Sequence, residues 1–237
     1  MFNTPLLSKK ESLVYSEFLS ERGRLFDVKA LLSKTSKMPT SSINISAFGC
    51  ITGSKLAKKP GTICYDCYAR SGYYHMPSVK TAMDEREKFI KSKYFIPAMV
   101  MELATTLEFR WWDSGDVRSV QMAHDVLDVC ERTPWCKHWL PTKEYAIWRE
   151  VLSVRKIPEN VALRASTPKV DAKPISGPWL TTTVFSDDDS PAKQGTECIA
   201  HLNKEKYGKY ECGTCRACWD TSIQNIAYPF RKKRTKK

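Results

Sequence analysis

The pattern of apolar and polar positions divides the first half of the chain into helices, a strand and a long loop. Apolar side chains recur every three to four residues over 8–32, which predicts one or two amphipathic helices, and again over 77–107, where Pro97 marks a break or a new first turn. Between them, residues 43–48 alternate apolar and polar side chains, which is typical of a strand. Residues 49–74 are rich in Gly, Lys and Cys and indicate a long functional loop.

Strands and helices alternate from residue 108 onward. The expected strands are 108–113, 137–140, 161–166 and 179–185, and the expected helices are 120–132 and 144–154. Short strands separated by helices indicate repeated βα units and a parallel sheet. With residues 43–48 this gives five strands, too few for a closed eight-stranded barrel but enough for an open one. The predicted fold class is α/β, with a partial (open) TIM-like βα barrel.

The same pattern predicts a single domain over residues 1–237, a length that can bury a proper core. Its expected parts are an N-terminal helical segment (1–40), the βα partial barrel (41–190), a cysteine-rich cluster-binding segment (191–222) and a basic tail (223–237).

Apolar runs and cysteine use bear on where the protein works. No apolar stretch approaches the 18 residues of a membrane span, and the first residues lack the apolar core of a signal peptide. We therefore expect no membrane association and a cytoplasmic location, where thiols stay reduced. Nine cysteines, an odd number, then favour metal binding or catalysis over disulfide bonds.

Seven of the nine cysteines fall into two groups with metal-ligand spacing. The upstream group reads C-x13-C-x2-C and consists of Cys50, Cys64 and Cys67. The C-terminal group reads C-x13-C-x2-C-x2-C and consists of Cys198, Cys212, Cys215 and Cys218. A two-residue gap lets two thiolates on one tight loop reach the same centre. Cys130 and Cys136 are interpreted as an ordinary buried thiol and a peripheral one.

The spacing favours iron–sulfur clusters over zinc. Zinc ribbons usually pair two C-x2-C knuckles, whereas a C-x2-C-x2-C run with one remote cysteine is common for clusters. Cys198 is the natural remote ligand of the C-terminal group. The three upstream thiols leave one iron open for a substrate or cofactor, or for a fourth ligand such as His75. We predict one or two 4Fe–4S clusters; zinc, and a single site drawing on both groups, stay open as alternatives.

Charged and polar residues follow several of the predicted strands. In parallel βα folds the active site gathers at the carboxyl ends of the strands. The residues at these positions are Asp113, Ser114, Gly115, Asp116, Lys143 and Arg164. A charge within an apolar strand needs a partner or a ligand, which also singles out Arg110. We predict that the four charged members of the set act catalytically, although Asp113 or Ser114 taken singly is also explained as a helix cap.

The formal net charge of +12 implies attraction to polyanions. Six basic residues lie within 231–237, and without them the charge is still +6. We expect DNA or RNA as a partner, bound through this tail and a basic surface, with a merely solvated terminus as the alternative. The tyrosines interleaved with basic residues over 55–74 either shield a cluster from water or offer a surface for base stacking.

Six sequence blocks from residue 49 onward resemble, in matching order, an uncharacterised family found in tailed bacteriophages. The blocks are G-C-x-T-G-S-K-L, P-G-T-x-C-x-x-C-Y-A-R-x-G, F-R-W-W-D-S-G-D, W-L-P-T-K-E, P-E-N-V-A-L-R-A-S and C-x2-C-R-A-C-W-D. The resemblance covers most of the chain and implies a phage-encoded protein.

More distantly, C-Y-A after a C-x2-C, an acidic loop after a strand and an L-P-T-K turn are similar to radical-SAM-like phage proteins. That resemblance implies a partial βα barrel in which the upstream cysteine group holds a cluster with one iron left for S-adenosylmethionine. It places Ser114, Gly115 and Asp116 where that superfamily has a Gly-Gly-Glu turn for the methionine amine. The chain departs from the superfamily in having thirteen residues where three are usual within the cysteine loop, and in lacking Gly-Gly-Glu.

These expectations lead to two main functions. The first is a phage-encoded iron–sulfur enzyme of the infected host cytoplasm that acts on a nucleotide or nucleic acid. The second is a nucleic-acid-binding protein whose iron–sulfur or zinc site is purely structural. Electron carriage alone is disfavoured, because 237 residues and a polar strand-end face exceed what a carrier needs.

Overall fold

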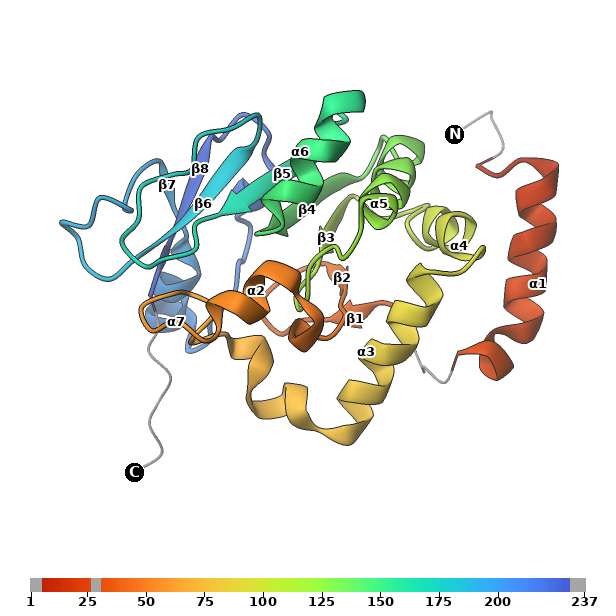
Figure 1. Ribbon diagram of the computed structural model, residues 1–237, viewed down its shortest axis with the longest axis horizontal. Coiled ribbons are helices and arrows are strands. Elements are labelled where there is room, and N and C mark those ends of the chain that lie inside the picture. Colours follow the sequence, from red (N-terminus) through yellow and green to blue (C-terminus); the bar gives the residue numbers. More distant parts are fainter. Residues whose placement is uncertain (1–5, 27–30, 231–237) are drawn as a thin grey trace.

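The protein folds around one open, mostly parallel sheet (Figure 1). The computed structural model describes residues 6–26 and 31–230, so the predicted basic arm at 231–237 lies outside the described residues. The strands are β1 (Ser33–Lys34), β2 (Ser41–Ile43), β3 (Glu108–Trp111), β4 (Lys137–Thr142), β5 (Val161–Ser166), β6 (Leu180–Phe185), β7 (Thr196–Glu197) and β8 (Asn225–Pro229). Their order is β1-β2-β3-β4-β5-β6-β8-β7, and among them only β1 runs antiparallel to its neighbour.

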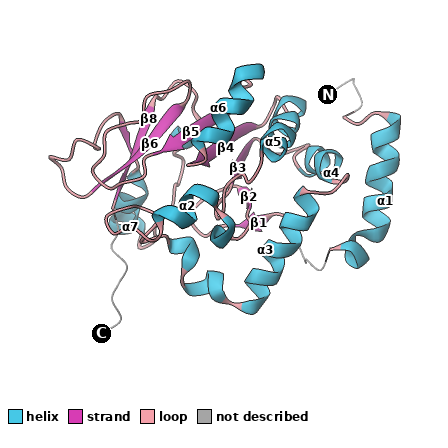
Figure 2. Ribbon diagram, viewed as in Figure 1, coloured by secondary structure: helices cyan, strands magenta, loops and turns pink. Residues whose placement is uncertain are grey.

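Strands β2 to β6 lie side by side in sequence order and run parallel, so each connection crosses back over the sheet. The connecting helices are α2 (Ile51–Leu56), α3 (Pro77–Ile90), α4 (Phe95–Glu102), α5 (Val120–Arg132) and α6 (Tyr145–Val154). Helices α4, α5 and α6 pack in a row on one side of the sheet, with α1 (Lys9–Leu25) outside α4, while α2 and α7 (Leu202–Tyr207) lie on the other side (Figure 2). The described strands end at the edges β1 and β7, so the α/β class and the parallel sheet are confirmed, and the sheet is open.

The apolar core lies between the sheet and the row of helices. The sheet contributes Phe109 and Trp111 from β3 and Leu163 from β5, and the helices contribute Val126 from α5 and Trp148 from α6. Each of these five side chains is at most 1% exposed. Helix α5 contributes an apolar face to the core because its apolar residues recur at helical spacing. The helix begins after the N-cap Ser119, whose hydroxyl accepts a hydrogen bond from the amide of Met122.

The opposite face of the sheet carries charge and tryptophan. Because successive residues of a strand point to opposite faces, Arg110, Trp139 and Arg164 project away from the helices. Trp139 meets Trp219 with ring centroids 5.3 Å apart, and the Arg110 guanidinium lies 4.3 Å from the Trp139 ring centre. Trp219 ends a 3-10 turn, Ala217–Trp219, that packs on β4 and β5. The cysteine-rich segment therefore folds against the sheet.

Some predicted boundaries are confirmed and others are wrong. Helix α5 and strand β5 begin and end at the predicted residues. The strand expected at 43–48 ends at Ile43, because the amide of Ile45 bonds to the carbonyl of Ser114 beyond the end of β3 and a 3-10 turn follows. Strand β8 was not predicted at all: it occupies part of the segment expected to be a basic tail and pairs with β6.

Candidate metal centres at two cysteine groups

The upstream cysteine group lies at the carboxyl end of the sheet, as the strand order predicts. Cys50 immediately precedes α2, and Cys67 immediately precedes a 3-10 turn. Thr52 in the first turn of α2 donates from its amide and its hydroxyl to the two carboxylate oxygens of Glu144, which follows β4. This paired contact fixes the cysteine loop to the end of the central strand.

Gly53 leaves a space beside two of the upstream thiols. A Cβ added at Gly53 would lie 3.7 Å from the Sγ of Cys50 and 3.7 Å from the Sγ of Cys64. The two sulfur atoms are therefore no further apart than twice that distance, and they border a space that any larger residue at Gly53 would fill.

The upstream thiols are coupled electrostatically. Burial raises the pKa of Cys50 to about 12, and the negative charges of Asp116, of the other two thiolates and of Glu144 add to the rise. Burial also raises the pKa of Cys64, while the positive charge of Lys143 opposes it. Thiols with raised pKa values are protonated and poorly nucleophilic at neutral pH, so this environment does not fit nucleophilic cysteine catalysis.

Asp116 and Lys143 lie beside the upstream group. The buried Asp116 carboxylate accepts hydrogen bonds from the amide of Val117 (2.9 Å), the hydroxyl of Thr142 (2.8 Å) and the amide of Lys143 (2.7 Å). Burial outweighs these bonds and raises the pKa of Asp116 to about 7. The Lys143 ammonium makes no hydrogen bond or ion pair with a described residue. The two predicted residues thus offer a proton-exchanging carboxyl group and an uncommitted cation near the thiols.

Asp113 occupies a different environment, although it lies only three residues before Asp116. Its carboxylate accepts hydrogen bonds from the side chains of Ser42 (2.5 Å), Ser33 (3.1 Å), Asn44 (3.1 Å) and Tyr74 (3.2 Å). These partners come from β1, from the end of β2 and from the loop after Cys67. The contacts favour a role in holding the strand ends together over the predicted catalytic role.

Ser114 and Gly115 pack against the end of β2. Gly115 has a φ of +87°, and a Cβ there would lie 2.8 Å from the carbonyl oxygen of Ile45, so both torsion and space require glycine. Ser114 is 3% exposed. Trp112 just before them has a φ of +55°, unusual for a large residue. Neither Ser114 nor Gly115 offers an open turn, which counts against the methionine-binding role implied by the radical SAM resemblance.

The C-terminal cysteine group is also gathered in space. Burial raises the pKa of Cys212, with further contributions from Cys198 and Cys215. Burial raises the pKa of Cys218 to about 12 against the opposing hydrogen bond from Tyr228, whose hydroxyl lies 3.0 Å from the Cys218 Sγ. The four predicted ligands therefore lie within electrostatic reach of one another.

Arg164 joins the C-terminal group to β5. The side chain is fully buried. Its guanidinium donates to the backbone carbonyl oxygens of Cys218 (2.9 Å), Ile223 (2.9 Å), Ala217 (3.2 Å) and Asp220 (2.7 Å). Four hydrogen bonds to one short segment favour a positioning role over the predicted catalytic role.

Arg110 lies between the two cysteine groups. Its Nη2 donates to the hydroxyl of Tyr68, the neighbour of Cys67, at 3.5 Å, and its charge opposes the rise in the pKa of Cys212. The Nε of Arg110 is buried and has no hydrogen-bond partner among the described residues. Arg110 therefore contacts the neighbour of an upstream cysteine and also acts electrostatically on the C-terminal group. The sequence pointed to Arg110 because it places a charge inside an apolar strand.

Sequence reasoning missed three residues that shape the two groups. Gly53 stands in the block G-C-x-T-G-S-K-L, and only the structure shows that it borders the thiols. Glu144 was noted only as part of a strand end, and its partner Thr52 is far away in sequence. Tyr228 lies in β8, which was not predicted, so nothing in the sequence pointed to its contact with Cys218.

The comparison with known families supports the phage resemblance. A family model described as Gene product 88 matches residues 30–221, an interval that contains both cysteine groups. The chain belongs to this family. Gene product 88 is a phage gene product, so the predicted phage family is confirmed, while a likeness to radical SAM proteins is not shown. No curated protein and no solved structure matches the chain.

The donor chemistry of this Gene product 88 protein suits soft metals, although the thiols are not arranged around a single ion. Four thiols in one group and three in the other are ligands that zinc and iron–sulfur clusters prefer. Within the described residues, no set of three or more His, Cys, Asp or Glu side chains is arranged to hold a metal ion. Cys130 and Cys136 are fully buried outside both groups, so the prediction that Cys136 is peripheral is wrong.

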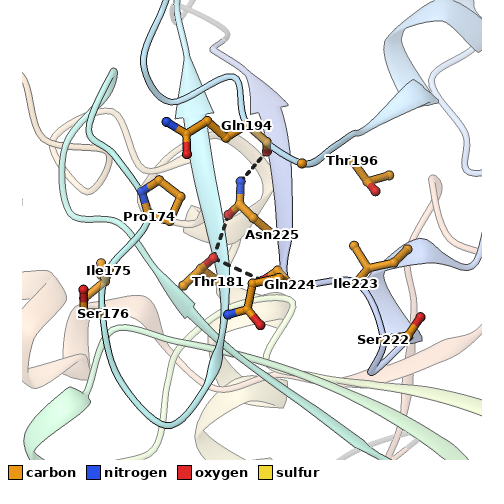
Figure 3. Close-up of a pocket in the computed structure, with 11 residues that line it drawn as sticks. Pro174, Ile175, Ser176, Thr181, Gln194, Thr196, Ser222, Ile223, Gln224 and Asn225 are labelled. Atoms are coloured by element: carbon orange, nitrogen blue, oxygen red, sulfur yellow. Dashed lines mark hydrogen bonds between the residues drawn. The ribbon is translucent and has the colours of Figure 1, made fainter.

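A pocket lies elsewhere, at the amino ends of β6 and β8 (Figure 3). Its volume is about 590 Å³, and no charged residue lines it. Its polar groups bond mainly to one another: Thr181 donates to the side-chain oxygen of Asn225 at 2.9 Å, and Asn225 donates to the carbonyl of Gln194 at 2.6 Å. The pocket thus brings together none of the predicted site residues.

No helix in the described ranges is both long and apolar enough to cross a membrane.

Proposed function

We propose that this protein is an iron–sulfur protein with one 4Fe–4S cluster at each cysteine group. The proposal rests on one observation: seven of the cysteines form a group of three and a group of four, and the members of each group lie within electrostatic reach of one another. A C-x2-C-x2-C run with a remote cysteine is a common way to hold such a cluster. The four-thiol group suits a closed site, and the three-thiol group suits a site with an open position.

A bound cluster would supply one-electron chemistry and, at the upstream group, an iron open to a substrate or cofactor. The side chains around the upstream group would move protons, bind an anionic group and hold the cysteine loop in place. Asp116 holds or releases a proton near neutral pH, and Lys143 offers a positive charge to an anionic group such as a phosphate. Glu144 keeps the cysteine loop against the end of β4. We therefore infer that the upstream group is the reactive one.

The proposal includes the partial βα barrel of radical SAM proteins but not their cofactor. The sequential, parallel order of β2 to β6 supports it, because a βα barrel is built in the same order. Binding of S-adenosylmethionine is not part of the proposal, since Ser114 and Gly115 are packed against Ile45.

A second candidate function is a nucleic-acid-binding protein whose metal, iron–sulfur or zinc, is only structural. The observation in its favour is that Arg164 and Glu144 tie both cysteine segments into the fold. In that case metal removal should unfold the protein, because the energy of metal binding is then part of the folding energy. In the first proposal the sheet should stay folded when the upstream metal is lost.

The test is metal and acid-labile sulfide content in protein purified without oxygen. We expect a brown protein that absorbs near ~400 nm and contains iron and sulfide in equal amounts. Colourless protein with zinc and no sulfide would refute the cluster and leave the structural candidate.

A further inference from the structure

The loop that carries the upstream cysteines exposes an unusual number of aromatic rings. Tyr73 is 81% exposed, Tyr68 57%, Tyr65 48% and Phe48 45%. Roughly half or more of each of these side chains is therefore open to solvent. A concentration of exposed apolar side chains marks an interaction surface.

Unpaired positive charge lies in the same loop. Lys55, Lys58 and Lys59 are exposed and form no ion pair with a described residue. Between residues 48 and 80 there are five lysines and arginines and only one acidic residue, Asp66. The surface therefore favours a partner that has both flat apolar groups and negative charge.

Two of the rings are held in place by neighbours while part of each ring stays exposed. The Tyr68 hydroxyl donates to the backbone carbonyl of Asp113 at the end of β3, and its ring centroid lies 5.9 Å from that of Tyr74. The Arg70 guanidinium lies 4.4 Å from the centre of the Phe48 ring. Rings fixed in this way lose little conformational freedom when another flat group stacks on them.

We propose that this loop binds single-stranded nucleic acid, with bases stacked on Tyr65, Tyr68, Tyr73 and Phe48 and phosphates bound by the three lysines. Unpaired bases offer the flat faces that such a surface needs, whereas the bases of a duplex are stacked on one another. This inference rests on the proposed function, because single-stranded nucleic acid would then be the substrate class of the strand-end site. Lys143 and Asp116 of that site lie behind the same loop.

The experiment measures binding of fluorescein-labelled oligothymidine, oligouridine and a duplex by anisotropy at several salt concentrations. Tyr65→Ala/Tyr73→Ala should weaken single-strand binding by about tenfold or more per ring at every salt concentration, with the salt slope unchanged. Lys58→Ala/Lys59→Ala should instead lower the slope by about 1.4, since each phosphate contact on a single strand contributes about 0.7. The comparison of oligothymidine with oligouridine distinguishes DNA from RNA.

A matched control lies on α1, at the opposite end of the molecule (Figure 1). Lys9 and Lys10 are exposed and form no ion pair with a described residue, and Leu13 is 73% exposed. Lys9→Ala/Lys10→Ala and Leu13→Ala remove the same charge and a comparable apolar side chain, and they should leave binding unchanged.

Equal losses in the loop and α1 variants, or duplex binding as tight as single-strand binding, would overturn the proposal. Iron content is measured on every variant, and we expect it to stay at the wild-type level. Normal iron with no binding refutes this inference alone. Binding without iron or sulfide refutes the proposed clusters alone.

Discussion

Gly53 and Cys50 are so close that a Cβ on Gly53 would stand 2.9 Å from the Cβ of Cys50. Side chains do not pack at that distance without moving, so glycine is required here by space; its backbone torsion is helical. Cys50 is the N-cap of α2, and Gly53 lies three residues later in the first turn of the helix, next to Thr52. The position of the first upstream thiol is therefore set by the packing of α2.

Replacement of Gly53 by alanine should move Cys50 or Cys64 and empty the upstream site while the C-terminal site stays filled. We expect iron per chain to fall to the content of one cluster and the free energy of unfolding to fall by about 1–3 kcal/mol, the usual cost of overpacking. Gly23→Ala is the control, because Gly23 lies in α1 with no atom within 4 Å of its added Cβ. Equal iron in the two variants would show that Gly53 does not shape the site.

Loss of the Glu144 carboxylate should release the cysteine loop from the sheet. Glu144→Ala removes two hydrogen bonds to a charged group, at 2.8 and 2.6 Å, and should cost about 2–3 kcal/mol in urea unfolding. Alkylation of the upstream thiols in metal-free protein, followed by mass spectrometry, should also become faster. Glu150→Ala, at an exposed position on α6, the helix that begins just after Glu144, should change neither quantity. Similar effects of both substitutions would argue against the anchor.

Arg164 should contribute to stability more than a surface arginine does. Arg164→Met removes four hydrogen bonds that a fully buried guanidinium donates to backbone carbonyl groups, so we expect a loss of at least about 3 kcal/mol and a C-terminal segment that is open to proteolysis. Arg24→Met breaks only an exposed pair with Glu21 and should cost less than about 1 kcal/mol. Comparable costs would contradict the positioning role of Arg164.

His138 should make stability depend on pH in the acid range. The buried imidazole accepts a hydrogen bond from Trp111 at 3.3 Å and lies 2.9 Å from the Thr133 hydroxyl, and burial lowers its pKa from 6.5 to about 3. Between these values the unfolded chain binds a proton that the folded protein does not, so stability rises with pH. The contribution amounts to about 1.4 kcal/mol per pH unit below 6.5.

The test for His138 compares urea unfolding at pH 7 and pH 5. His138→Gln should reduce the loss of stability between the two, whereas His124→Gln, at a position that is not buried, should keep the wild-type loss. An unchanged difference in His138→Gln would mean that the imidazole is not buried in its neutral form.

The parallel sheet could be predicted because its strands alternate with helices at regular spacing. Strand β5 is an almost continuous apolar run, and α5 has one apolar face, so the boundaries of both were predicted correctly. The proximity of Cys64 to Cys67, and of Cys212 to Cys215, could also be expected, since a two-residue gap keeps both thiols on one loop. Strand β8 could not be predicted, because its residues are held in place by pairing with β6, a partner far away in sequence.

The roles of individual polar residues were harder to predict. Asp113 and Asp116 lie three residues apart in one polar turn, yet one carboxylate is saturated by four neighbours and the other lies beside the thiols. That difference depends on partners from β1, β2 and β4, which no local pattern reveals. Arg164 likewise looked like a ligand-binding charge, and its partners are carbonyl groups that become neighbours only after the C-terminal segment folds back on the sheet.

The most direct test of the two-cluster account is iron and acid-labile sulfide per chain in wild type, Cys64→Ser and Cys215→Ser, all purified without oxygen. Wild type should contain two 4Fe–4S clusters, and each serine variant should retain one of them. Cys130→Ala is the control outside both groups and should retain both clusters. Zinc without sulfide in wild type, or loss of all iron in either serine variant, would contradict the account.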